Sequence, residues 1–248
     1  MQKIILLLLI IILTFSCNKK GYSIDAIIEG VEDGRKVTLK KRGEEKIIIV
    51  DSTTIQNGKF SFKGIMEEPT HFGIFIDKIT KQNEGIFPLL NINDHIKIVA
   101  YKDSLHTSKV TGSVFNSQLT KLRLERDKIS AKAKLYAKEY QEARKTNDTT
   151  NINKIKKIYA TIQDEISLND WNFILKNPDS YVAPMVLNGL IRDLKYKDSI
   201  QPAFDSFSKE IQNSIAAKPV RDYFEYITKQ NAPKKEIPTT PKQESKKE

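Results

Sequence analysis

Between residues 22 and 113 the hydrophobic positions follow the pattern of short strands separated by turns. Phe60 and Phe62 alternate with polar residues, and such alternation is typical of a strand with one buried face. Asn57-Gly58 stands between two apolar runs and supplies residues that tolerate the positive φ of a hairpin turn. Strands at this spacing, with no helical pattern between them, predict an antiparallel β-sandwich or open barrel. The predicted strands are 22–28, 36–41, 46–55, 59–64, 71–77, 85–90, 95–101 and 109–112.

After Gly112 the apolar residues recur at spacings of three and four, which is typical of a helix with one buried stripe. The stripe predicts a long helix that ends near Arg144, and a polar break at 147–150 separates it from a second helical stripe over 155–173. We expect the two helices to pair as a hairpin. At 1.5 Å per residue each is roughly 35 to 45 Å long, which is more than the sheet needs to cover itself.

The last third of the chain is predicted to form short helices and then a tail. Asn177-Pro178 ends the second long helix, because the residue before a proline is disfavoured in the helical conformation. The short helices are predicted near 181–193, 199–206, 208–214 and 218–229. The segment 231–248 has three prolines and eight charges in 18 residues, so it is predicted to be disordered. The chain is therefore expected to be α+β, with a β domain over 22–113 and a helical domain over 114–230.

The N-terminus has the pattern of a processing segment. Lys3 precedes an apolar run of 12 residues, 4–15, which is too short for the ~20 residues of a spanning helix. It has the length of the apolar core of a secretory signal, which is about 7 to 15 residues. Polar and basic residues follow the run directly, so the segment predicts export from the cytoplasm.

Ser16 and Cys17, at the end of the apolar run, resemble the lipobox of bacterial lipoproteins. The resemblance implies that the sulfur of Cys17 receives a diacylglyceryl group and that a peptidase cuts between Ser16 and Cys17. Residues 1–16 are then the signal peptide and residues 17–21 a lipidated linker. Phe15 leaves a conventional signal or an uncleaved anchor open as alternatives.

Lipidation at Cys17 predicts a protein attached to a membrane of the cell envelope. Two or three acyl chains hold a protein essentially permanently, whereas one chain binds reversibly. Asn18 favours the outer membrane, by analogy with sorting in other lipoproteins. Lys19-Lys20, in place of an acidic run, favours the periplasmic face over surface export. Because export separates the protein from nucleic acid, no nucleic-acid partner is expected.

The content of cysteine and histidine excludes several kinds of chemistry. One cysteine in 248 residues forms no internal disulfide, CxxC pair or four-thiolate zinc site. His71, His95 and His106 have no ligand spacing, so structural roles are expected, with no metal and no cofactor. The sequence contains no GxSxG, Walker, GxGxxG or HExxH motif. We therefore predict no catalytic residue.

Most of the net charge of +10 lies in the predicted helical hairpin. The segment 121–157 has 12 basic and 5 acidic residues, a net charge of +7. Basic side chains on a membrane-anchored protein can contact anionic lipid or lipopolysaccharide phosphates, each contributing on the order of 1 kcal/mol. The alternative is a solvated helix face with acidic partners one turn away. The candidate contact residues are Lys121, Arg123, Arg126, Lys128, Lys132, Lys134 and Lys138.

The order of these features resembles a family of envelope lipoproteins of the Bacteroidota type. The resemblance rests on the lipobox, IIIVDSTTIQNGKFSFKG (47–64), VTGS (110–113) and NPDSYVAPMVL (177–187). In that family a β-rich N-terminal domain of unknown function precedes a thioredoxin-like (AhpC/TSA or redoxin) domain. Only 18 residues follow Gln230 here, too few for such a domain, and the CxxC of the family has no counterpart. The resemblance implies location, architecture and a connection with envelope thiol chemistry.

Two functions follow as expectations. The first is a non-catalytic binding or scaffolding module, anchored by lipid in the cell envelope. The alternative is an accessory partner of a thioredoxin-like thiol-disulfide oxidoreductase. An enzyme with dispersed catalytic residues is a third hypothesis, and it would need a concave pocket with convergent polar groups.

Overall fold

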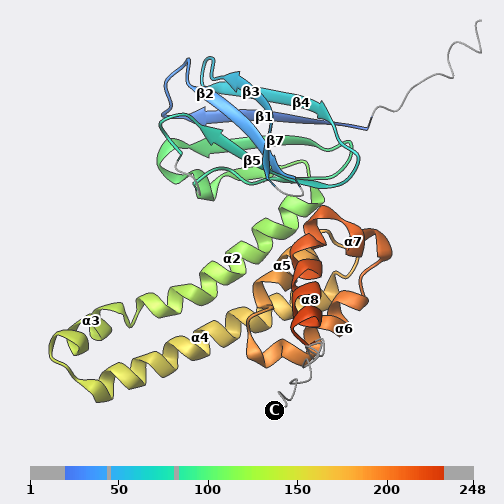
Figure 1. Ribbon diagram of the computed structural model, residues 1–248. Coiled ribbons are helices and arrows are strands. Elements are labelled where there is room, and N and C mark those ends of the chain that lie inside the picture. The colour runs from blue at the N-terminus through green and yellow to red at the C-terminus, as the bar shows by residue number, and fades with distance from the viewer. Residues whose placement is uncertain (1–19, 44–45, 81–83, 232–248) are drawn as a thin grey trace, which may run out of the picture.

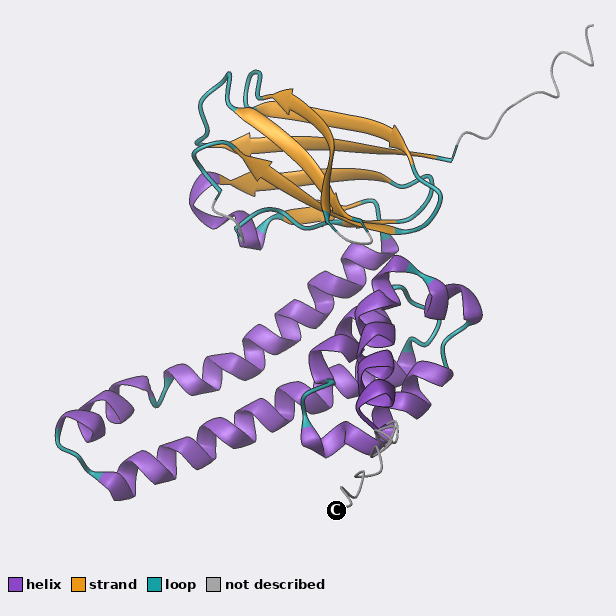
Figure 2. Cartoon of the chain, in the orientation of Figure 1, coloured by secondary structure: helices purple, strands orange, loops and turns teal. Residues whose placement is uncertain are grey.

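The computed structural model of the protein describes residues 20–43, 46–80 and 84–231, which form a β-sandwich and a helical part (Figure 1). The helical part begins at Val114 with a long helical hairpin, and a group of shorter helices packs beside the base of that hairpin (Figure 2). The far end of the hairpin extends away from both the sandwich and the short helices. The α+β class and the sandwich-like arrangement predicted from the sequence are confirmed.

The described part of the chain has eight strands in two four-stranded sheets, with the orders β4-β1-β7-β8 and β3-β2-β5-β6. Every run predicted as a strand contains one, and most bounds agree within two residues. The strands are β1 (Gly21–Glu29), β2 (Lys36–Arg42), β3 (Ile47–Thr54), β4 (Lys59–Ile65), β5 (Thr70–Ile76), β6 (Leu89–Leu90), β7 (His95–Tyr101) and β8 (Lys109–Thr111).

The core of the sandwich is built from alternate side chains of the strands. In β1, Ile24, Ala26 and Ile28 are buried, whereas Asp25 and Ile27 are exposed. Successive residues of a strand point to opposite faces of the sheet, so this apolar set of β1 lines the space between the sheets, whereas β3 has no buried side chain. The same alternation buries Phe60 and Phe62 of β4 and Ile96, Ile98 and Ala100 of β7.

One pair of neighbouring strands is parallel, which the prediction of an antiparallel sheet did not include. β1 pairs with β7 in parallel, and Ile24 lies opposite Ile96. Five strands separate β1 from β7 along the chain, and several of them belong to the other sheet. Because no tight hairpin joins the pair, local sequence does not determine its direction.

The predicted strand over 85–90 is wrong in its first part. Only Leu89–Leu90 forms strand β6, and an isolated bridge joins Ile86 to Ile74 before it. Pro88 interrupts the ladder because it has no backbone N–H to donate. The carbonyl of Pro88 still accepts from the N–H of Phe72, so the segment follows β5 without continuous pairing.

The helices of the described residues agree with the predicted order, and three short 3-10 helices add to it. The α-helices are α2 (Val114–Lys134), α3 (Ala137–Lys145), α4 (Thr149–Lys176), α5 (Val182–Leu190), α6 (Ile200–Asp205), α7 (Lys209–Asn213) and α8 (Lys218–Asn231). The 3-10 helices are η1 (Lys102–Thr107), η2 (Leu194–Ser199) and η3 (Ile215–Ala217). The segment predicted to be disordered, 231–248, lies outside the described residues except for Asn231, the last residue of α8.

The prediction of one continuous helix up to Arg144 is wrong at Leu135 and Tyr136, which separate α2 from α3. Both residues make backbone bonds to the third residue before them, so the chain tightens into a 3-10 turn. Neither proline nor glycine marks the bend in the sequence. Beyond it, the ring of Tyr140 lies 5.7 Å from the ring of Tyr159, which holds α3 against α4.

The helical part has its own apolar core around α5. Val182, Ala183 and Leu187 are fully buried there. The ring of Trp171 stacks on Tyr196 with 4.8 Å between ring centroids, and Phe173 packs against the same core. These aromatic residues therefore serve in packing.

Asn116 joins the sandwich to the helical part. Its amide oxygen accepts from the N–H of Leu89 at 3.0 Å, and its amide nitrogen donates to the carbonyl of Leu89 at 2.7 Å. The hydroxyl of Ser113, which caps α2, donates to the same carbonyl at 3.1 Å. All these groups are buried, and Leu89 packs in the helical core, so strand β6 is held directly against the start of α2.

Candidate ligand-binding cleft

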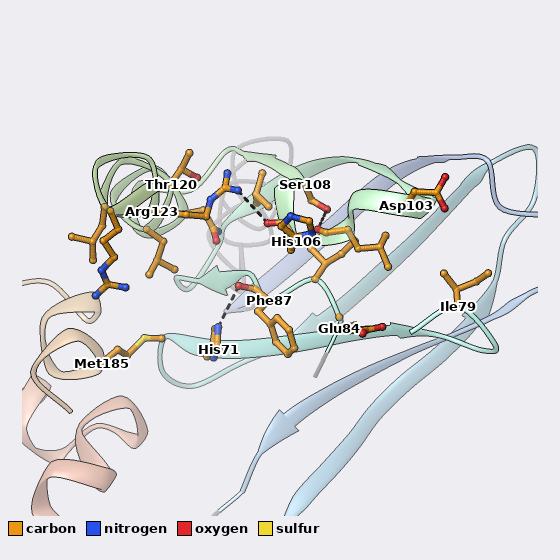
Figure 3. A pocket seen from close by; sticks show the side chains of 18 of the residues that line it. His71, Ile79, Glu84, Phe87, Asp103, His106, Ser108, Thr120, Arg123 and Met185 are labelled. Carbon is orange, nitrogen blue, oxygen red and sulfur yellow. Dashed lines mark hydrogen bonds between the residues drawn. The ribbon is translucent and has the colours of Figure 1, made fainter. Parts of the chain in front are cut away.

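A cleft of about 860 Å³ lies between the sandwich and α2. Four segments form its walls: residues 84–87, the 3-10 helix η1, strand β8 and the first half of α2 (Figure 3). The joint at Asn116, which also lines the cleft, sets the position of α2 against the sandwich. This volume is within the ~300 to 1,000 Å³ of typical small-molecule sites.

Much of the cleft wall is apolar. Ile86 and Leu105 come from the sandwich side, and Leu119 and Leu122 come from α2. Ile86, Leu105 and Leu122 are buried. The apolar surface open to the hydrocarbon part of a ligand comes instead from the exposed Phe87 and the half-buried Val110 and Leu119.

Arg123 supplies a cation to this wall. Its guanidinium donates one hydrogen bond to the carbonyl of His106 at 3.2 Å (Figure 3). The ion pairs among the described residues leave Arg123 without a carboxylate partner. Since a guanidinium has five N–H donors and the bond to His106 uses one, donors remain for an anionic ligand.

Arg126, one turn further along α2, is paired with a carboxylate. Its Nε and Nη2 donate to Oδ1 and Oδ2 of Asp170, both at 2.7 Å. The side chain of Asp170 is 8% exposed, so the pair is largely shielded from water. This geometry matches the planar fork of a guanidinium to a carboxylate. Arg126 borders the cleft, but its charge is neutralised by the carboxylate of Asp170 on α4.

The structure does not bring the other candidate anion contacts to the cleft. Lys132 pairs with Glu165 of α4. The remaining four candidates are exposed along the hairpin, and none lines the cleft: Lys121, Lys128, Lys134 and Lys138. Arg123 and Arg126 are therefore the two of the seven that the fold places together at this site.

His71 lies at the edge of the cleft in β5. Its Nε2 donates to the carbonyl of Phe87 at 3.2 Å, which fixes the segment before β6 against β5 (Figure 3). Burial lowers the pKa of His71 below its usual value, so the ring is neutral at neutral pH. With the proton on Nε2, the Nδ1 atom is an acceptor. The structural role expected for this histidine is confirmed.

The sequence did not identify several of the residues that line the cleft as candidate site residues. Lys102, Asp103 and His106 line the cleft from η1, and Ser108 follows them. The available signal was the cluster of turn-forming residues between two predicted strands, which indicates a loop. Nothing in that cluster indicates which helix the loop faces, because the helix begins later in the chain.

A serine–histidine pair lies elsewhere in the sandwich. Ser23 Oγ is 2.8 Å from Nδ1 of His95, and the two residues are directly opposite each other on β1 and β7. Neither is among the described residues that line the cleft. The described residues also contain no group of three or more His, Cys, Asp and Glu side chains able to hold a metal ion.

The comparison with known families concerns the sandwich. Residues 22–119 match DUF4369, a domain of unknown function. The DUF4369 region covers the described strands except for Gly21, the first residue of β1, and ends at Leu119. It therefore supplies the sandwich side of the cleft, whereas Arg123 lies beyond it. The link to thioredoxin-like domains stays a prediction. No curated protein matches the chain.

The predicted anchor lies outside the part of the chain that the structure describes. Ser16 and Cys17 belong to residues 1–19, so lipidation at Cys17 stays a prediction. None of the described helices combines the length and the apolar composition needed to cross a bilayer.

Proposed function

We propose that the protein is a non-catalytic binding module of the cell envelope that takes an anionic amphiphile in the cleft. The single observation behind this proposal is the guanidinium of Arg123, which stands on an apolar wall without a carboxylate partner among the described residues. A ligand with one carboxylate or phosphate and a hydrocarbon portion complements both features. The neighbouring charge of Arg126 is already satisfied by Asp170.

The geometry favours a planar or tetrahedral anion at the Arg123 end of the cleft. A guanidinium forms paired N–H bonds with carboxylate and phosphate oxygens, and such charge-assisted bonds are stronger than neutral ones. The hydrocarbon portion would lie along Phe87, Val110 and Leu119. Free fatty acids and lipid phosphates share this chemistry, so the test includes one probe of each kind.

Replacing Arg123 by glutamine is expected to weaken binding of dodecyl phosphate and dodecanoate roughly 10- to 100-fold. The estimate follows from the loss of a charge-assisted bond of about 1.5 to 3 kcal/mol, at 1.4 kcal/mol for each factor of ten. Isothermal titration calorimetry below the micellar concentration of each probe measures the change. A preference for one probe identifies the headgroup class.

Lys121→Gln is the matched control, because Lys121 is an exposed cation on α2 that does not line the cleft. It should bind both probes as the wild type does. Dodecyl maltoside, which has the same chain and no charge, should bind weakly to all three proteins. Equal affinities of the wild type and Arg123→Gln for the anionic probes would contradict the proposal.

We also propose that Cys17 carries the lipid and holds the protein at the outer membrane, facing the periplasm. The support is the sequence of residues 1–20. Cys17→Ser is expected to move most of the protein from the membrane to the soluble fraction, measured by fractionation and immunoblotting. A variant that stays in the membrane with residues 1–16 attached would indicate an uncleaved anchor instead. Density-gradient separation of the two membranes tests the location of the wild type.

A further inference from the structure

Strand β3 carries four consecutive exposed apolar side chains. The exposed fractions are 67% for Ile47, 41% for Ile48, 66% for Ile49 and 38% for Val50. Isolated exposed apolar residues are common on proteins, but a contiguous run of this kind marks an interaction surface. The run forms one end of β3, and we refer to it as the β3 edge.

The backbone of the β3 edge is open on one side. β3 is the outermost strand of its sheet, and among the described strands β2 is its only neighbour. An outermost strand presents N–H and C=O groups that have no partner within the sheet. Natural edge strands are protected by proline, charged residues or bulges. Among the described residues, the β3 edge has a charged residue on either side, Lys46 and Asp51, and a bulge near Val50, opposite Leu39 and Lys40.

A basic hollow lies beside the β3 edge. It has a volume of about 370 Å³, and Ile47, Phe75 and Phe87 form its apolar lining. Four cations line it as well, and no acidic residue does so among the described residues: Lys40, Lys41, Arg42 and Lys46. The Nζ atom of Lys40 lies 4.6 Å from the centre of the Phe75 ring.

None of these four cations forms an ion pair with a described residue. The turn between β2 and β3 contains Glu44 and Glu45, which lie outside the described residues. Counting both, the segment 40–46 has four basic and two acidic residues and a net charge of +2. The β3 edge therefore has apolar side chains and an outer side without a neighbouring strand, and the residues around it carry positive charge.

We infer that the β3 edge binds an extended acidic segment of a partner protein as an added strand. Main-chain hydrogen bonds to β3 would supply affinity, and alternate side chains of the segment would supply specificity. Its apolar residues lie on the face of Ile47 and Ile49, and its carboxylates point to the other face, where Lys41 lies opposite Ile48. This inference is independent of the cleft, since the two surfaces share only His71 and Phe87 among their described lining residues.

The observations favour this occupant over two others. An anionic lipid surface would match the charge and the apolar side chains, but it would leave the backbone of the strand unpaired. A second copy of the chain would pair the backbone, but its own β3 offers a single carboxylate, Asp51, against four cations. An acidic extended peptide satisfies the backbone, the apolar run and the charge together.

The test uses synthetic heptapeptides and the full chain. A fluorescein-labelled peptide with the sequence EIEVEIE is expected to bind the wild type, measured by fluorescence anisotropy. The peptide KIKVKIK and a form of EIEVEIE with alternate N-methylated amides are expected to bind at least about tenfold more weakly. The first carries the opposite charge, and the second lacks alternate N–H donors.

The double variant Ile47→Ser, Ile49→Ser is expected to weaken binding of EIEVEIE about tenfold or more. Ile65→Ser is the matched control, since Ile65 is 70% exposed at the end of β4, and it should bind as the wild type does. Both replaced positions of β3 are about two-thirds exposed, so the fold is expected to persist. The exposed Lys41, on the face of the carboxylates, gives a second test of the charge through Lys41→Gln.

Equal binding of EIEVEIE and KIKVKIK would overturn the inference. So would binding to vesicles that contain phosphatidylglycerol without binding to either peptide, which would indicate a lipid surface. A concentration-dependent dimer in analytical ultracentrifugation that the double serine variant abolishes, with no peptide binding, would indicate a second copy instead.

Discussion

Replacing Asn116 by alanine is expected to lower the free energy of unfolding by about 2 to 4 kcal/mol. The amide of Asn116 satisfies both the N–H and the carbonyl of Leu89 in a buried joint. Alanine removes both partners, and each buried backbone group left without a hydrogen bond costs about 1 to 3 kcal/mol. The bond from Ser113 to the carbonyl of Leu89 persists, which limits the loss on that side.

Urea unfolding followed by two signals measures this effect. Trp171, the single tryptophan, reports on the helical core by fluorescence, and far-UV circular dichroism reports on the whole chain. The matched control is Asn153→Ala, because Asn153 is exposed in α4 and makes no side-chain hydrogen bond to a described residue. It should change stability by less than about 0.5 kcal/mol.

The two signals also test whether Asn116 couples the sandwich to the helical part. If the joint is the main coupling, the fluorescence and dichroism transitions of Asn116→Ala should separate, because two-state behaviour needs both parts to unfold together. A loss below about 1 kcal/mol with coincident transitions would show that apolar packing around Leu89 holds the joint instead.

The strands were predictable because their cause is local. Alternation in Phe60 and Phe62 and the turn at Asn57-Gly58 are properties of neighbouring residues, and the structure confirms them. The parallel pairing of β1 with β7 depends on contacts between distant segments, which no local pattern contains. The bend at Leu135 has no proline or glycine to mark it.

The role of each basic residue was not predictable for the same reason. Arg123 and Arg126 are three residues apart on α2 and look equivalent in the sequence. They differ because Asp170, 44 residues after Arg126, reaches only one of them. The apolar run of β3 is a similar case. A continuous apolar run is typical of a strand buried on both faces, and only the sheet order shows that it lies at an edge.

Replacing Arg126 by methionine is expected to cost about 2 to 3 kcal/mol of stability. The variant leaves the carboxylate of Asp170 buried without a cation, and breaking a fully buried pair in this way costs about 3 to 5 kcal/mol. The side chain of Arg126 is 38% exposed, so solvent screening reduces the expected loss. Thermal or urea unfolding of the variant and the wild type measures it.

A second variant distinguishes the loss of the ion pair itself from the cost of leaving the carboxylate of Asp170 buried without a partner. The double variant Arg126→Met, Asp170→Leu removes both charges, so it should be more stable than Arg126→Met alone, because no ionised group is left in an apolar site.

Lys132→Met is the matched control: it breaks a pair between the same two helices, and Lys132 and Glu165 are 52% and 41% exposed. An exposed pair contributes about 0 to 1 kcal/mol, so this control should be nearly neutral. Equal losses for Arg126→Met and Lys132→Met would show that water reaches Asp170 and that α2 and α4 are held together by their apolar stripes alone.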